Sequence, residues 1–131
     1  MDSRIAELMP LESFPPACGQ GTIAIECRED DSRMRERLAA LDHWETSVAL
    51  ACERAFLAAL DGSCKTPVAG YARIDDGALL FDGVILSEDG HESYEASAVG
   101  DPADATAVGD TAGRDVRRRA PPAFLKRLGI G

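Results

Sequence analysis

The chain has 131 residues, a formal net charge of −9 and 45% apolar residues. This length suffices for one packed domain, or for one small domain and part of another. The negative charge argues against nucleic-acid binding, which depends on neutralising phosphates, and no apolar run approaches the roughly 18 residues that a membrane span needs. We therefore expect neither nucleic acid nor a membrane as a partner. The acidic start, without the apolar core of a signal peptide, favours a cytoplasmic location.

The N-terminal third predicts a hinge, a strand and a helix. Two prolines after Phe14 would break a helix and are typical of a linker. Gly19 and Gly21 flank Gln20, which indicates a tight turn or the close approach of a ligand, although the spacing and lysine of a phosphate loop are missing. Residues 22–28 are predicted to form a strand buried on both faces, and a helix over residues 32–41 is predicted to begin at Ser32.

A second helix is predicted over residues 43–60, with Asp42 and Glu45 as a variant capping box. Its apolar face predicts Trp44 and Cys52 as core residues. The helix should end at Asp61 and Gly62, because a glycine past a helix end lets the chain turn away. The following loop presents Cys64, and Pro67 opens a strand.

Cys64 has two interpretations. Most single cysteines are small buried hydrophobes. Here the thiol lies between Ser63 and Lys65 in a tight loop, and a neighbouring ammonium favours the reactive thiolate. The negative end of the preceding helix opposes that effect, so these residues alone leave both interpretations open.

The remaining cysteines do not predict a metal or redox protein. The four are Cys18, Cys27, Cys52 and Cys64, and no two of them form a C-x-x-C pair. With only two histidines, the chain has no recognisable zinc-ligand spacing. We expect reduced thiols and no metal.

Residues 68–74, 78–86 and 91–98 predict a three-stranded antiparallel meander, with its first turn at Asp76 and Gly77, a bulge near Asp82 and Gly83, and an edge strand last. A helix is predicted from Asp101 to about residue 119, weakened by two glycines, and a short helical turn follows in residues 123–131. Four arginines near the helix end suit its dipole, with an anion-binding patch as the alternative: Arg114, Arg117, Arg118 and Arg119. The predicted fold class is α+β, a small three-stranded antiparallel sheet covered on one face by helices.

Two motifs resemble the porphobilinogen deaminase family, also called hydroxymethylbilane synthases. The first resembles the family's cofactor-attachment signature: Glu53, Arg54, Phe56, Leu60, Gly62, Ser63, Cys64, Thr66, Pro67, Val68 and Ala69. Many members have Gly where Ser63 stands and Gln where Lys65 stands. The second motif precedes it in the family's order: Gly19, Gln20, Gly21, Glu26, Cys27, Arg28, Asp30 and Asp31. The resemblance covers residues 10–98 well and the C-terminal helix only loosely.

The resemblance implies that Cys64 carries a dipyrromethane cofactor through a thioether. We add Gly19, Gln20 and Gly21 as candidate cofactor-binding residues, because their backbone could approach a ligand closely. The family joins four porphobilinogen units head to tail with release of ammonia, in porphyrin and heme biosynthesis. Porphobilinogen and oligopyrrole intermediates are therefore the implied partners.

The resemblance also implies that this chain is a C-terminal portion. In the family the catalytic aspartate and the carboxylate-binding arginines lie in two preceding domains, so we expect no catalytic residue here and no activity of the chain alone. Residues 1–41 would be the hinge, return strand and helix of incomplete N-terminal domains, and residues 42–131 the cofactor-carrying domain. The alternative is a non-catalytic tetrapyrrole carrier, or a subunit that completes a split enzyme together with the missing N-terminal domains.

Overall fold

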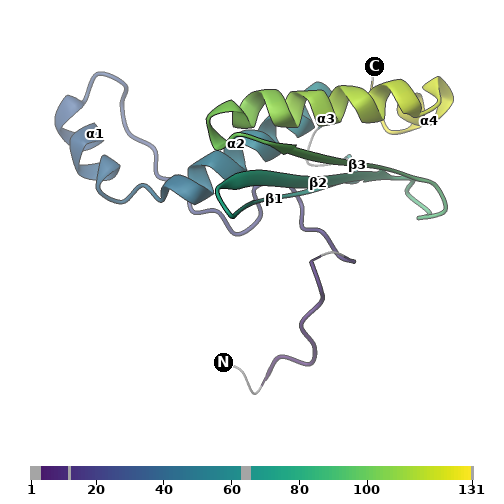
Figure 1. Ribbon diagram of the computed structural model, residues 1–131, viewed down its shortest axis with the longest axis horizontal. Coiled ribbons are helices and arrows are strands. Elements are labelled where there is room, and N and C mark those ends of the chain that lie inside the picture. Colours follow the sequence, from purple (N-terminus) through teal and green to yellow (C-terminus); the bar gives the residue numbers. More distant parts are fainter. Residues whose placement is uncertain (1–3, 12, 63–65, 131) are drawn as a thin grey trace.

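A three-stranded antiparallel sheet with helices on one face forms the body of the protein, which confirms the predicted α+β fold. The computed structural model describes residues 4–11, 13–62 and 66–130. In chain order the elements are α1 (Ser32–Ala39), α2 (Trp44–Ala59), β1 (Val68–Asp75), β2 (Ala78–Leu86), β3 (Ser93–Gly100), the 3₁₀ turn η2 (Pro102–Asp104), α3 (Ala105–Arg119) and α4 (Pro122–Arg127). Figure 1 shows α2 and α3 side by side above the sheet, whose strand order is β1-β2-β3.

The first hairpin has the predicted turn. Asp76 and Gly77 have φ angles of 48° and 80°, so both central residues are left-handed, as a two-residue turn matched to the strand twist requires. The predicted bulge at Asp82 and Gly83 is wrong, because Gly83 pairs with Gly70 in an unbroken register. Gly83 makes room instead: a Cβ there would lie 2.7 Å from the Phe56 ring and 2.8 Å from the Phe81 ring.

Aromatic and aliphatic side chains fill the space between the sheet and the two helices. The Phe56 and Phe81 rings lie 4.9 Å apart between centroids, and Cys52 is fully buried as predicted. The predicted core position of Trp44 is wrong, since that side chain is 58% exposed. Trp44 is the first residue of α2, and the buried residues of this helix begin only at Cys52.

The two glycines of α3 let it approach α2 closely. A Cβ on Gly109 would overlap the Cys52 carbonyl oxygen, and one on Gly113 would lie 2.9 Å from the Phe56 carbonyl oxygen. The helix runs unbroken to Arg119 despite the poor helix propensity of glycine. The residues that weaken α3 in isolation therefore allow its packing in the fold.

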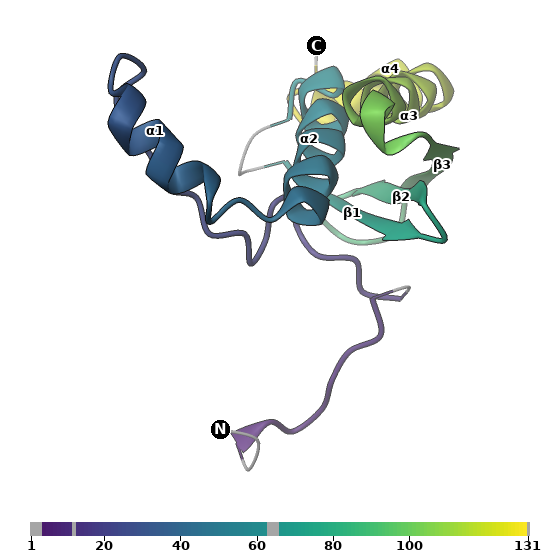
Figure 2. The ribbon, with the colours of Figure 1, turned by 60° about the vertical axis from the view of Figure 1, so that its left-hand side comes forward.

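Apart from residues 15–19, the N-terminal third packs little against this body, and Figure 2 shows α1 standing apart from α2. The prediction of a buried strand over residues 22–28 is wrong for the described chain: these residues have no strand assignment, and Ile23 and Ile25 are 88% and 58% exposed. The segment pairs with none of the described strands, since β1 pairs with β2 and β2 with β3. α1 has no buried residue, and its N-cap is Asp31 rather than Ser32.

The N-cap of α2 also differs from the prediction. The His43 ring accepts a hydrogen bond from the Thr46 amide at 3.4 Å, whereas the Asp42 carboxylate accepts one from the Ser47 hydroxyl at 2.6 Å. Within the described ranges, no helix is long and apolar enough to cross a membrane.

Candidate functional site

The loop between α2 and β1 contains the predicted attachment cysteine. Cys64 lies outside the described residues, together with Ser63 and Lys65, but both ends of the loop are described. At the first end, Asp61 donates its amide to the Ala58 carbonyl at 3.0 Å, and Gly62 donates to the Leu57 carbonyl at 2.9 Å. This pair of bonds is the Schellman pattern, which satisfies the last carbonyls of a helix.

The left-handed residue of this cap is Asp61, with a φ of 50°, and not Gly62 as the sequence suggested. A side chain at position 62 would crowd the end of α2, because a Cβ there would overlap the end of the Leu57 side chain and lie 3.2 Å from the Leu57 carbonyl oxygen. The helix thus ends where the sequence predicts. Asp61 adopts the left-handed backbone conformation, and Gly62 leaves room for the Leu57 side chain.

An arginine of α3 holds this helix end. Arg117 Nη1 donates to Asp61 Oδ2 at 2.8 Å and to the Ala59 carbonyl at 3.2 Å. The contact ties the C-terminus of α2 to α3 just before the cysteine loop starts. The sequence identified Arg117 only as one of four clustered arginines. Its partner, Asp61, lies 56 residues earlier in the chain, so the residues around Arg117 do not predict this contact.

The second end of the loop is fixed by the sheet. The Pro67 carbonyl accepts a hydrogen bond from the Leu86 amide of β2 at 3.0 Å, and the Thr66 carbonyl accepts one from Val68 at 2.8 Å. β1 begins at Val68, directly after the proline, as predicted. The points where the cysteine loop leaves α2 and enters β1 are therefore both held by the packed body.

The three other candidate residues form a turn, and one of them, Gly19, contacts the middle of α2. Gln20 donates its amide to the Ala17 carbonyl at 3.0 Å, and Gly19 and Gly21 have φ angles of 75° and 82°. Gly19 contacts α2 at Glu53, roughly 10 Å along the helix axis from Leu60. The predicted tight turn is confirmed. The described contacts of Gly19 are with α2 and not with the ends of the cysteine loop, and cofactor binding by these residues stays a prediction.

Glu53 is a structural residue that sequence reasoning used only as part of a motif. Its side chain is 8% exposed, and it accepts hydrogen bonds from the Gly19 amide at 2.7 Å and the Ala72 amide at 2.9 Å. Glu53 shares a helical face with Phe56 and Leu60. An acidic residue on an otherwise apolar helix face indicates a buried, hydrogen-bonded carboxylate, and this pattern could have identified the role of Glu53.

Two thiols lie close to this buried carboxylate. Burial and the charge of Glu53 raise the pKa of Cys18 to about 11. The same two causes, with a smaller contribution from Cys18, raise the pKa of Cys52 to about 12. Both thiols are therefore protonated at neutral pH and are poor nucleophiles. Among the described residues, no group of three or more His, Cys, Asp or Glu side chains could hold a metal ion.

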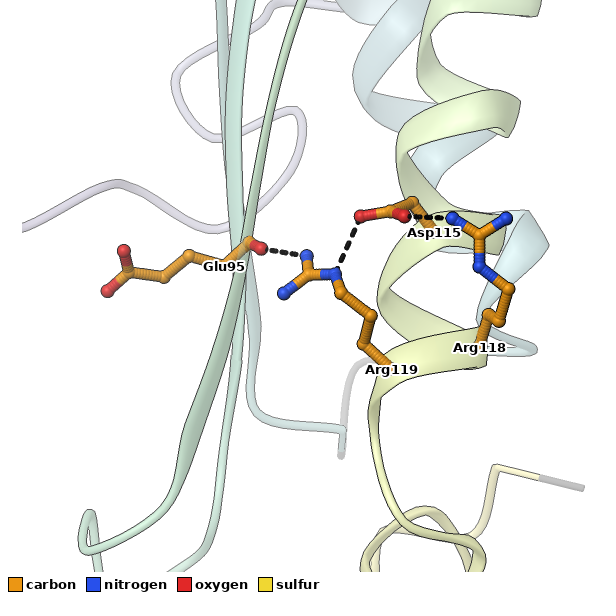
Figure 3. A network of polar contacts seen from close by, with 4 residues as sticks. All are labelled: Glu95, Asp115, Arg118 and Arg119. Atoms are coloured by element: carbon orange, nitrogen blue, oxygen red, sulfur yellow. Dashed lines mark hydrogen bonds and ion pairs between the residues drawn. The ribbon is translucent and has the colours of Figure 1, made fainter.

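The arginines of α3 are ion-paired rather than free to bind an anion. Figure 3 shows Asp115 between Arg118 and Arg119, at 2.7 Å and 2.8 Å, and Arg119 also donates to the Glu95 carbonyl of β3. Hydrogen bonding to Arg119 contributes most to lowering the pKa of the Asp115 carboxyl. Arg114 pairs with Asp110 at 2.7 Å. These contacts favour the helix-end interpretation over the binding patch.

Two family models match the chain, in the order that the motifs suggest. Residues 1–36 match the model described as "Porphobilinogen deaminase, dipyromethane cofactor binding domain", and residues 48–117 match "Porphobilinogen deaminase, C-terminal domain". A porphobilinogen deaminase of Nitrobacter hamburgensis is 45% identical over 125 residues, which is 95% of this chain. One of Nitrobacter winogradskyi is 44% identical over the same length. The chain spans 40% of the length of each relative.

Proposed function

Because the chain belongs to the porphobilinogen deaminase family, we propose that it is the C-terminal part of a hydroxymethylbilane synthase. The proposed reaction joins four porphobilinogen units head to tail with release of ammonia, and it serves tetrapyrrole synthesis. The substrates are porphobilinogen and the growing oligopyrrole. The single observation that carries the proposal is the 45% identity that extends through both matched regions.

In this proposal Cys64 holds a dipyrromethane cofactor through a thioether. When bound, that group supplies the pyrrole end to which new units are joined. The chain's own contribution is positional: Asp61 and Pro67 fix the two ends of the loop that contains the cysteine. A group attached to a loop with fixed ends loses less translational and rotational entropy on meeting a second reactant than a group that is free in solution.

The described residues fit an attachment point better than a complete cofactor site. A dipyrromethane bears carboxylate side chains, which bind best to arginine or lysine. Arg117, which contacts the first end of the loop, is already paired with Asp61. We therefore assign the carboxylate-binding cations to the preceding domains, and keep Gly19, Gln20 and Gly21 as secondary candidates for contact with the cofactor.

Residues 1–41 are proposed to belong to those preceding domains, and residues 42–131 to form the cofactor-carrying domain. The exposure of Ile23 and Ile25 supports this division, because exposed apolar side chains outside any described helix or strand suit a strand that completes another sheet. The catalytic aspartate would then lie outside this chain. The 131 residues alone should lack activity.

The test is complementation. The chain is produced alone, and together with the part of the Nitrobacter hamburgensis enzyme that precedes the matched region, and hydroxymethylbilane formation is measured. We expect product only from the pair, and none from the pair carrying Cys64→Ala. Product from the chain alone would contradict its inactivity, and an inactive but stable complex would favour the non-catalytic carrier.

A cytoplasmic location is also part of the proposal. Cys18, Cys27 and Cys52 are free thiols in the described part of the chain, as is usual in a reducing compartment. Cell fractionation with an antibody to the chain measures this directly.

A further inference from the structure

Residues 15–19 lie along the open edge of β1. The Pro16 carbonyl accepts a hydrogen bond from the Gly70 amide at 3.0 Å. Cys18 packs against the core, and a Cβ on Gly70 would lie only 2.9 Å from its sulfur. The segment is thus docked through both its backbone and a side chain.

Glu53 of α2 completes this docking. Its two carboxylate oxygens accept from different parts of the chain, one from Gly19 and the other from Ala72 of β1. Because β1 pairs only with β2 among the described strands, the outward amides of Gly70 and Ala72 need partners elsewhere. Pro16 and Glu53 supply those partners, so the carboxylate joins the N-terminal segment, the helix and the sheet edge.

The contacts with the packed body end between Gly19 and Gly21. A Cβ on Gly19 would lie 3.1 Å from the Leu50 side chain, whereas one on Gly21 would meet nothing within 4 Å. Beyond Gly21, the side chains of Ile23 and Ile25 are exposed. The change from a held backbone to an exposed one therefore falls within residues 19–21.

We propose that Glu53 is a positioning residue that anchors residues 15–19 to the edge of β1. It joins the region matched by the first family model to the region matched by the second. Residues 15–19 are therefore held by β1 and α2, although the proposed division counts them with the preceding domains. This assignment does not depend on whether Cys64 carries a cofactor.

The test uses three cysteines of the full chain as reporters. Cys27 is exposed and reports the intrinsic alkylation rate, Cys18 reports the docked segment, and the buried Cys52 reports global unfolding. Glu53→Gln keeps the shape of the side chain but replaces one acceptor oxygen with a donor. Glu45→Gln is the control, because Glu45 lies exposed on the same helix. Iodoacetamide labelling of each cysteine is followed by peptide mass spectrometry, and amide hydrogen exchange is measured in parallel.

In Glu53→Gln we expect Cys18 labelling, relative to Cys27, and Gly19 amide exchange both to rise roughly tenfold or more, the factor that a lost charge-assisted hydrogen bond is worth. Cys52 and the amides of β2 should keep their wild-type rates, and Glu45→Gln should change none of them. Faster Cys18 labelling without faster Gly19 exchange would mean that Glu53 only slows ionisation of the nearby Cys18 thiol and does not anchor the segment. Equal acceleration at Cys18 and Cys52 would make Glu53 an ordinary core residue. Either result, or no change at all, overturns the proposal.

Discussion

At the residue scale, Gly83 decides how the aromatic core packs. It faces Gly70 across the first hairpin, and a Cβ on Gly83 would lie within 3 Å of both the Phe56 and Phe81 rings. Gly83→Ala should therefore destabilise the fold by about 1–3 kcal/mol, the usual cost of overpacking. Urea unfolding measures this loss.

The matched control for Gly83→Ala is a double-mutant cycle with Phe56→Leu. A smaller side chain at position 56 relieves one of the two clashes, so the double variant should be more stable than the sum of the single changes predicts. Strict additivity would show that the Phe56 ring is not what excludes a side chain at position 83.

The two protonated thiols predict a loss of stability in alkaline solution. Their pKa values are about 11 and about 12 in the folded protein, mainly because of burial, against 9.0 for an ordinary cysteine. As the pH rises above 9, the unfolded chain loses these protons first, so the free energy of unfolding falls until the folded thiols ionise as well. In Cys18→Ala/Cys52→Ala the decline between pH 9 and 11 should be shallower, as measured by urea unfolding at each pH. Parallel pH curves for both proteins would contradict the assignment.

At the scale of elements, the contact between α2 and α3 depends on the absence of side chains. Gly109→Ala improves the helix propensity of α3 by about 1 kcal/mol, yet its methyl group would overlap the Cys52 carbonyl. We expect a net destabilisation of about 2 kcal/mol in urea unfolding, because the backbones must separate. Thr106→Ala, at an exposed position of the same helix, should change stability by less than about 0.5 kcal/mol. A neutral or stabilising Gly109→Ala would mean that the helices are not held at this separation.

The sequence predicts the elements well where local chemistry determines them. The turn at Asp76 and Gly77, the start of β1 after Pro67 and the end of α2 all follow from residues adjacent in the chain. The predictions that failed depend on distant partners. Gly83 pairs regularly and leaves room for the Phe56 ring of α2 instead of forming a bulge. Whether residues 22–28 form a strand depends on a sheet edge to receive them.

The same division applies to the candidate site. The cysteine loop and its bounding residues could be predicted from a local motif. The roles of Glu53 and Arg117 could not, because each forms hydrogen bonds to groups far away in the sequence. From the sequence, Glu53 was only part of a motif and Arg117 only one of several arginines.

At the scale of the whole molecule, the exposed N-terminal third predicts self-association. Ile23 and Ile25 are exposed, and exposed apolar side chains can pack against another copy. Ile23→Lys/Ile25→Lys should therefore lower the weight-average mass in sedimentation equilibrium at high concentration. Leu8→Lys, which removes an 81% exposed side chain elsewhere, should have a smaller effect. Association that is insensitive to the double change would show that residues 22–28 do not mediate it.

The central claim is that Cys64 is the covalent attachment point of the cofactor. The most direct measurement is the peptide-resolved mass of this chain after production with the N-terminal part of the Nitrobacter hamburgensis relative, beside the Cys64→Ala variant. We predict an added mass equal to a dipyrromethane on the peptide that contains Cys64, and none in the variant. An added mass on the peptides of Cys18, Cys27 or Cys52, or a catalytically active complex with no added mass on any cysteine, would contradict the claim.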